Sequence, residues 1–276
     1  MNKIFITAAI TGAGTMKSAA PTVPYHADEI AAEVVACAKA GAAIAHIHVR
    51  DDKGAGTMST EKFREAFYAT KKAIKEAAVD VIINLTTSGG KAPTEIRLAH
   101  LKELKPEMCS FDAGSMNWGN RTVFENSPEF LEQLGTCTSM LGIKPEIEIF
   151  DAGMMGNAQH YINKGFLKKP CHYQFVMDVP GGLDGTVRNL EFLHSMLPSD
   201  CTWSVTGIGK THLPMLLTGL ALGANGIRVG LEDNIMLSKG VVATNVQLVE
   251  RAVRIAKEAG RTIASAEETR RILGII

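Results

Sequence analysis

Runs of apolar and β-branched residues recur along the chain and alternate with longer stretches that have a helical pattern. Each run is short and ends in polar or glycine residues, which is typical of a buried strand. The pattern predicts eight strands, over Ile4–Thr11, Ala43–Val49, Val81–Thr87, Met108–Gly114, Pro145–Phe150, Tyr173–Val179, Thr202–Ile208 and Gly226–Leu231.

Between the strands, apolar residues recur at three- and four-residue intervals, which indicates helices. Strands alternating with helices imply right-handed βαβ units and a parallel sheet. Eight such units in 276 residues fit a closed (β/α)8 TIM barrel, and a doubly wound sheet is the alternative. The clearest predicted helices are Ala27–Ala40, Thr60–Ala78, Ser127–Leu134 and Leu190–Leu197.

After the last strand, the stretch from Val241 to Ala259 predicts a final barrel helix that stops at Gly260. Ala266–Leu273 predicts a short terminal helix. No proline-, glycine- or serine-rich linker divides the chain, so we expect a single domain over residues 1–276 with a short C-terminal helical extension.

The composition excludes several classes of protein. The chain is 46% hydrophobic and 21% charged, whereas a disordered chain has low hydrophobicity and high net charge. Its 29 basic and 29 acidic residues cancel, so no net field favours nucleic acid or an anionic membrane. No apolar run approaches the roughly 20 residues of a membrane span.

The cysteines and the first residues indicate the compartment. Five cysteines without a C-x-x-C pair argue against a disulfide framework or a thiolate zinc site. Met1-Asn2-Lys3 followed by the apolar run from Ile4 to Ile10 superficially resembles the charged and apolar regions of a signal peptide. Thr7 interrupts that run and Thr11-Gly12 closes it, so we interpret it as the first strand and expect a cytoplasmic protein. The cysteines are Cys37, Cys109, Cys137, Cys171 and Cys201.

Ala45-His46-Ile47-His48-Val49 places two histidines on the second predicted strand. Alternate residues of a strand point to the same side, so both imidazoles face the barrel interior. Two imidazoles about 6.6 Å apart along a strand can reach one metal ion. Hydrogen-bonded core histidines are the alternative, but a position at the strand's carboxyl end favours a metal site.

A third metal ligand is expected from a neighbouring strand, because catalytic zinc usually takes three protein ligands and keeps a fourth position open. In the eighth strand, Arg228, Gly230 and Glu232 alternate with apolar residues and share the inward face. That strand lies beside the first in a closed barrel, and the first lies beside the second. Glu232 can therefore meet His46 and His48 over the barrel mouth, and a solvated loop carboxylate is the alternative.

Arg228 faces inward, where an unpaired guanidinium is costly, so we expect a carboxylate partner. Glu146 and Glu148 share one face of the fifth strand, and Glu148 is preferred because it lies nearer the strand's carboxyl end. A purely structural ion pair between Arg228 and Glu148 is the alternative. Asp233 directly follows the expected metal ligand and can act as a general base.

Two other motifs are incomplete. Gly12-Ala13-Gly14 lacks the third glycine of a dinucleotide-binding loop, because Lys17 stands there. Gly209-Lys210-Thr211 lacks the leading glycine of a phosphate-binding loop, because Ser204 stands there. We interpret the remaining histidines as structural; they are His26, His100, His160, His172, His194 and His212.

A series of longer motifs runs through the chain in order. They are I-T-A-A-I-T-G-A, H-I-H-V-R-D, I-N-L-T-T-S-G-G, K-P-E-M, K-P-E-I-E-I-F-D-A-G-M, F-V-M-D-V-P-G-G, G-I-G-K-T-H and G-I-R-V-G-L-E-D-N. Together, and at compatible spacing, they resemble the β-keto acid cleavage enzymes, a family first described as a domain of unknown function. The resemblance spans essentially the whole chain.

This resemblance implies a TIM barrel with one Zn²⁺ per chain and acetyl-CoA as co-substrate. The family is an acyltransferase family: a β-keto acid and acetyl-CoA give acetoacetate and a new acyl-CoA by a retro-Claisen step. It also implies a homo-oligomer, a tetramer. The residues that match the family's site are His46, His48 and Glu232 as metal ligands, Asp233 as base held by Arg228 and Glu148, and Thr86 and Ser110 as hydroxyls lining the substrate pocket.

The charge of the substrate can be narrowed further. The branch of the family that cleaves amino-bearing keto acids has Glu after T-G-A, suited to pair with the substrate's ammonium. This chain has Gly14 there, and no acidic residue between Thr11 and Val23. We therefore expect a neutral or anionic β-keto acid, more strongly so if Lys17 points inward. The alternative is that Gly14 only serves the turn and another loop supplies the acid.

Three further expectations concern the chemistry. We expect Arg228 to keep the pKa of Asp233 low. A metal-dependent TIM-barrel hydrolase, or an aldolase or lyase, is the alternative enzyme. Hydrolases with H-x-H carry further histidines at the ends of strands five and six, where this chain has Glu148 and Val179-Pro180. A non-catalytic metal- or acyl-CoA-binding protein is the alternative from a different class.

Overall fold

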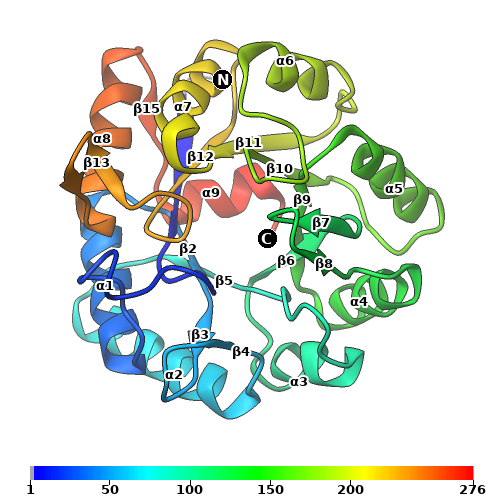
Figure 1. The fold of residues 1–276 in the computed structure, drawn as a ribbon, viewed down its shortest axis with the longest axis horizontal. Coiled ribbons are helices and arrows are strands. Elements are labelled where there is room, and N and C mark those ends of the chain that lie inside the picture. Colours follow the sequence, from blue (N-terminus) through cyan, green and yellow to red (C-terminus); the bar gives the residue numbers. More distant parts are fainter. Residues whose placement is uncertain (1–2, 276) are drawn as a thin grey trace.

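The computed structural model describes residues 3–275, in which eight parallel strands close into a barrel surrounded by helices (Figure 1). Pairing of the last barrel strand with the first closes the ring, which confirms the (β/α)8 TIM barrel. Residues 1, 2 and 276, which the expected domain and the signal-peptide alternative include, lie outside the described residues. The barrel strands are β1 (Lys3–Ala9), β2 (Ile44–Ile47), β5 (Ile82–Leu85), β6 (Met108–Asp112), β9 (Lys144–Ile149), β10 (His172–Met177), β11 (Thr202–Gly207) and β12 (Gly226–Val229).

Helices fill the intervals between the barrel strands and cover the outside of the ring (Figure 1). Each buries an apolar face against the strands, which is what the three- and four-residue spacing of apolar positions requires. The helices are α1 (Ala27–Ala40), α2 (Thr60–Glu76), α3 (Thr94–Leu104), α4 (Pro128–Leu141), α5 (Ala152–Asn163), α6 (Val187–Ser195), α7 (His212–Ala221) and α8 (Asn245–Glu258), with a short 3₁₀ turn η1 (Gly209–Thr211) before α7.

Several helix boundaries differ from the sequence pattern. α4 continues beyond Leu134 to Leu141, because its buried face also continues. α6 begins earlier than expected, at Val187. The stretch from Val241 to Thr244 was expected to begin the last barrel helix, and this is wrong. Val241 instead begins a strand, and Thr244 caps α8 by accepting a backbone hydrogen bond, so helix formation starts only after this cap.

Short antiparallel hairpins extend the loops that follow β2, β6 and β12. They lie at the carboxyl-terminal ends of the barrel strands, the end at which TIM barrels carry their active sites. They are β3 (Val49–Arg50) with β4 (Gly56–Thr57), β7 (Met116–Trp118) with β8 (Thr122–Phe124), and β13 (Met236–Ser238) with β14 (Val241–Val242).

The opposite end of the barrel is covered by the last part of the described chain. β15 (Thr262–Ile263) pairs with the start of β1, and α9 (Ala266–Leu273) lies behind the centre of the ring in Figure 1. Leu273 of α9 packs into a buried cluster with Phe5, Ile44 and Met108, which are on barrel strands. This apolar packing closes the amino-terminal end of the barrel, so the polar chemistry is left at the other end.

Two further observations concern the chain as a whole. No helix among residues 3–275 is both long and apolar enough to cross a membrane. The cysteines carry free thiols, and all but the half-buried Cys201 are buried.

Candidate active site

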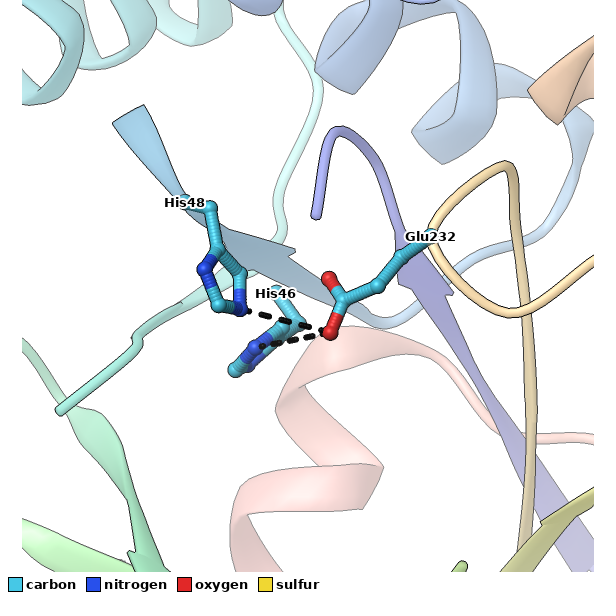
Figure 2. A group of neighbouring side chains, drawn as sticks. All are labelled: His46, His48 and Glu232. Carbon is cyan, nitrogen blue, oxygen red and sulfur yellow. Dashed lines mark ion pairs between the residues drawn. The ribbon is translucent and has the colours of Figure 1, made fainter. Parts of the chain in front are cut away.

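His46 and His48 lie side by side at the carboxyl end of β2 and point into the barrel (Figure 2). Their ring centroids are 5.1 Å apart and the planes are inclined by 67°. His46 pairs in register with Ala9 of β1, and β1 in turn pairs with β12. The same-face placement predicted from strand alternation is therefore present, with the expected neighbours on either side.

Glu232 reaches the two histidines from a turn that follows β12. Its Oε1 lies 3.7 Å from His46 Nε2 and 3.3 Å from His48 Nε2 (Figure 2). The turn depends on Gly230, which has φ +150°, and a Cβ there would lie 2.1 Å from the carbonyl oxygen of Ala9. No side chain fits that gap, so glycine is required for the chain to turn Glu232 toward the histidines.

A second glycine makes room for the carboxylate. Gly12 has φ +60°, and a Cβ at this position would lie 2.7 Å from Cγ of Glu232. The loop after β1 can therefore pack directly against the Glu232 side chain. Substitution of Gly12 would displace the carboxylate from the histidines.

The donor set fits a divalent cation. One ligand atom each from His46, His48 and Glu232 lies within 4.8 Å of the others. Burial lowers the pKa of His46 to about 3, so its ring is neutral, as a metal ligand must be. Oε2 of Glu232 is buried without a hydrogen-bond partner among the described residues. Two imidazoles and one carboxylate are a usual ligand set for catalytic zinc.

Arg228 forms ion pairs with three carboxyl groups at this site. Its Nε donates to Asp233 Oδ2 at 2.9 Å and its Nη1 to Glu148 Oε1 at 3.1 Å. Its Nη2 donates to Glu232 Oε1 at 2.6 Å and to Asp233 Oδ1 at 3.1 Å. Arg228 is only 3% exposed, so the expected carboxylate partner Glu148 is present. Glu146 accepts instead from the side-chain amide of Asn84.

Strand alternation does not explain Asp233. Glu232 and Asp233 are adjacent, yet both turn inward to Arg228, because β12 ends at Val229 and a turn follows. The backbone N–H of Asp233 donates to the carbonyl of Gly230 at 3.2 Å. The turn that Gly230 permits therefore brings two consecutive carboxylates to one guanidinium, which a continuing strand would not do.

The pKa of Asp233 differs from the sequence-based expectation. Burial raises the pKa of this carboxyl, and the adjacent Arg228 only partly offsets the effect, so the expected low value is wrong. Burial likewise raises the pKa of Glu148 well above its usual value and that of Glu146 to about 7. Thr206 donates its hydroxyl to Asp233 Oδ2 at 3.0 Å, the same oxygen that accepts from Arg228 Nε.

A cavity of about 650 Å³ opens over these groups. One wall is polar and contains both histidines, Arg228, Glu232 and Asp233. The opposite wall is apolar and includes the β7–β8 hairpin, where Trp118 and Phe124 pack edge to face on Phe150. The cavity can thus hold a small molecule with a polar end at the charged wall and an apolar end at the aromatic wall.

The substrate-pocket residues expected from the family motifs lie in different places. Gly14 lines the cavity. Thr86 and Ser110 are buried, and their hydroxyls accept backbone N–H groups, that of Ser88 at 3.0 Å for Thr86 and that of Thr87 at 2.9 Å for Ser110. These two hydroxyls therefore support the loop after β5.

Ser88 and Asp112 line the cavity, although the sequence did not single them out. The Ser88 hydroxyl donates to Asp112 Oδ2 at 2.8 Å, and burial raises the pKa of Asp112. Ser88 follows β5 and Asp112 ends β6, so both lie at the carboxyl ends of barrel strands. Their position was a usable signal, but the residues' direction depends on the loop conformation.

Lys17 does not point into the cavity. Its Nζ bonds Glu29 of α1 at 2.7 Å and lies over the ring of Tyr25. The position of Lys17 therefore gives no argument for a neutral or anionic substrate. Lys17 instead ties the loop after β1 to α1.

Arg50, in the H-I-H-V-R-D motif, holds the same loop from the other side. Its Nη2 donates to the carbonyl oxygens of Thr11 at 3.1 Å and Thr15 at 2.9 Å. Its Nη1 donates to the carbonyl of Gly54 in the β3–β4 turn at 2.8 Å. Arg50 is 2% exposed and joins the loop after β1 to the β3–β4 turn.

Comparisons with known proteins agree with this architecture. A family model described as "beta-keto acid cleavage enzyme" matches residues 3–275. The 3-keto-5-aminohexanoate cleavage enzyme of Fusobacterium nucleatum is 41% identical, over 100% of this chain and 99% of that protein. The 3-dehydrocarnitine:acetyl-CoA trimethylamine transferase of Rhizobium meliloti is 35% identical, over 99% and 97%. The apo structure of ObcA superposes with a TM-score of 0.81 at 21% identity, covering 92% of this chain and 66% of that one.

Proposed function

Because the chain belongs to the β-keto acid cleavage enzyme family, we propose that it is an acyltransferase that converts a β-keto acid and acetyl-CoA into acetoacetate and a new acyl-CoA. The observation that carries the proposal is the group His46, His48 and Glu232 directly beside the Arg228–Asp233 pair. A metal site and a candidate base in one cavity can activate and deprotonate the same substrate.

His46, His48 and Glu232 would hold one divalent ion, zinc by the nature of its ligands. When bound, the ion supplies a Lewis acid that polarises the keto group and neutralises the substrate's carboxylate. Carboxyl groups outnumber the cation that pairs with them at this wall, since Arg228 alone bonds Glu148, Glu232 and Asp233. Oε2 of Glu232 still lacks a hydrogen-bond partner among the described residues, so it is available to a cation.

Asp233 is the proposed general base. It would remove a proton from the carbon between the keto and carboxylate groups of the substrate, where the proton is acidic. The raised pKa of the Asp233 carboxyl makes it a stronger base than an ordinary aspartate. Arg228 and Thr206 grip both carboxylate oxygens and orient the side chain.

The proposed reaction forms and breaks bonds in balance. The carbanion attacks the thioester carbonyl of acetyl-CoA, a C–C bond forms, and the CoA thiolate leaves. The thiolate then attacks the original keto carbon, and the bond between that carbon and the former nucleophile breaks. Acetoacetate departs after taking back the proton held by Asp233, and the rest of the keto acid remains as acyl-CoA.

The substrate's distal group is proposed to be neutral or anionic. Gly14 offers no charge to an ammonium group, and the facing wall is built from the aromatic rings of Trp118, Phe124 and Phe150. Asp112 is the carboxyl of this cavity outside the Arg228 cluster, and its Oδ2 already accepts a hydrogen bond from Ser88. The aromatic rings offer apolar contact to an alkyl substituent.

The experiment is an assay of zinc-loaded enzyme with acetyl-CoA and a panel of β-keto acids that carry neutral, anionic and ammonium groups. The expected result is formation of acetoacetate and acyl-CoA in equal amounts, with both dependent on the keto acid. Release of free acid without acyl-CoA would identify a hydrolase. Consumption of neither substrate across the panel would favour a binding protein.

A further inference from the structure

A second cavity, of about 510 Å³, lies beside the first. It is bounded by η1 and the start of α7 on one side and by the β13–β14 hairpin and α8 on the other. Thr15, Ile208, Glu232 and Asp233 line both cavities. The two spaces therefore meet at the candidate base, and one molecule can extend from the second into the first.

The outer part of the second cavity is positively charged. Lys210 of η1, Lys239 of the β13–β14 turn and Arg251 of α8 line it. The carboxylates in its lining, Glu232 and Asp233, sit at the inner end and are bonded to Arg228. Two exposed lysines and the half-buried Arg251, whose Nη1 donates to the carbonyl oxygen of Leu237, give this lining a positive charge that favours an anion such as phosphate.

His212 is an unsatisfied polar group in the same lining. It is 3% exposed, and neither ring nitrogen has a hydrogen-bond partner within the described part of the chain. Burial, with help from Arg251, lowers its pKa to about 4, so the ring is neutral. A neutral imidazole offers one donor and one acceptor, which suits an uncharged amide. A buried polar group without a partner in the folded chain points to a ligand.

The loop that carries these groups is tied to the candidate base. Gly209, with φ +58°, donates its backbone N–H to the carbonyl oxygen of Asp233 at 2.9 Å. This hydrogen bond joins the G-I-G-K-T-H segment, which carries Lys210 and His212, to the backbone of Asp233. The motif is incomplete as a phosphate-binding loop of the nucleotide-binding type. It nevertheless lies directly beside the candidate base Asp233.

We propose that Lys210, Lys239, Arg251 and His212 bind the phosphate-bearing tail and the amide-bearing arm of the acyl-CoA co-substrate, so that its thioester reaches Asp233 where the cavities meet. This assignment rests on the proposed function, because that function requires an acyl-CoA. The cations would bind the phosphates and His212 an amide of the pantetheine arm. Coenzyme A carries both kinds of group in one flexible chain.

The test is calorimetric binding of two probes, CoA and pantetheine, which lacks the phosphates. The proteins compared are the wild type, the double variant Lys210→Ala/Lys239→Ala and the control variant Lys164→Ala. Lys164 is an exposed lysine at the end of α5. We expect the double substitution to raise the Kd for CoA about tenfold and to leave that for pantetheine unchanged. His212→Leu is expected to raise the Kd for both CoA and pantetheine.

Kinetics provide a second readout. In the double variant, KM for acetyl-CoA should rise about tenfold while KM for the β-keto acid and kcat stay near the wild-type values. KM for acetyl-CoA should also depend less on salt than in the wild type, because fewer charges contact the ligand. These results would support the assignment, since a general structural defect would alter both substrates.

The outcomes separate the two proposals. Equal CoA affinity in the wild type and the double variant would overturn the tail site, even if the wild type turned over normally. Wild-type protein that binds CoA through these lysines but turns over no β-keto acid would support the tail site and overturn the proposed reaction. Absence of CoA binding by the wild type would overturn the tail site.

Discussion

Arg228 holds Asp233 with two hydrogen bonds, Nε to Oδ2 at 2.9 Å and Nη2 to Oδ1 at 3.1 Å. This fork fixes the plane of the carboxylate, because the guanidinium is itself rigid and buried. The same guanidinium bonds Glu148 and Glu232. A residue of the proposed metal group and the proposed base are therefore positioned by one side chain.

The first prediction concerns the base. Asp233→Asn should retain the metal and bind substrate but lose about 10²–10⁴-fold in kcat, the usual contribution of a general base. Metal content, substrate affinity and steady-state kinetics measure the three quantities separately. Asp200→Asn, an exposed aspartate paired with Lys169, is the matched control and should be unchanged. Turnover near the wild-type rate in Asp233→Asn would mean that another group removes the proton.

The same prediction extends to the groups that orient Asp233. Glu148→Gln and Arg228→Met should each lower kcat, and their effects should not add in the double variant or with Asp233→Asn, because the three residues act as one unit. Additive losses would show that Glu148 and Arg228 act by separate routes.

The second prediction concerns the metal. The purified protein should hold about one divalent ion per chain, preferably zinc, and His46→Ala/His48→Ala should lose it while remaining folded, since residues at the active end contribute little to the barrel core. Elemental analysis and circular dichroism check the two parts. His160→Ala, an exposed histidine of α5, should keep its ion. Stoichiometric metal in the double variant would place the ion elsewhere.

The third prediction concerns substrate charge at position 14. A Cβ on Gly14 would meet no described atom within 4 Å, so a longer side chain can be accommodated there. Gly14→Glu should raise kcat/KM for an ammonium-bearing β-keto acid by roughly 10- to 150-fold, the worth of one charge-assisted hydrogen bond. Gly14→Gln, similar in size but uncharged, should give little of this gain. Wild-type enzyme that prefers the ammonium-bearing substrate would contradict the assignment.

The fourth prediction concerns pH and stability. His100 is buried, its Nε2 lies 2.9 Å from the carbonyl oxygen of Thr86, and its ring stacks on Phe63 at 4.0 Å. Burial lowers the pKa of His100 from 6.5 to about 4. Between pH 6.5 and about 4, His100 is protonated in the unfolded chain but neutral in the folded chain. The free energy of unfolding therefore falls as the pH drops below 6.5.

Replacement by Gln removes this titration. The free-energy gap between wild type and His100→Gln should accordingly shrink by about 2 kcal/mol from pH 8 to pH 5. Urea unfolding of both proteins at the two pH values measures the gap. A gap that is independent of pH would show that His100 carries its proton equally in both states.

The parts of the site that follow from local periodicity could be predicted from the sequence. His46 and His48 share a face because strand side chains alternate, and the pairing of β12 with β1 and of β1 with β2 brings the end of β12 near them. The direction of the Glu232 side chain depends in addition on the turn at Gly230. The partnership of Arg228 with Glu148 follows from the cost of an unpaired buried charge. These rules need only the alternation of side chains along a strand, the order of strands in a closed barrel and the cost of a buried charge.

The parts that depend on loop conformation could not be predicted. Gly230 turns the chain after β12, so Asp233 faces inward against the alternation. Lys17 points to Glu29 because a helix from a later segment packs beside its loop. The raised pKa of Asp233 reflects its burial, which only the folded chain defines. Pattern reasoning identifies the strand ends, while the turns decide which side chains enter the cavity.

The central claim is that the acetyl group of acetyl-CoA becomes part of acetoacetate while CoA passes to the remainder of the keto acid. Zinc-loaded enzyme with acetyl-CoA labelled by ¹³C at both acetyl carbons and unlabelled 3-oxohexanoate tests this directly. NMR should find the label at C3 and C4 of acetoacetate and none in the butanoyl-CoA that forms with it. Label in the new acyl-CoA, or labelled acetate without acyl-CoA, would contradict the account.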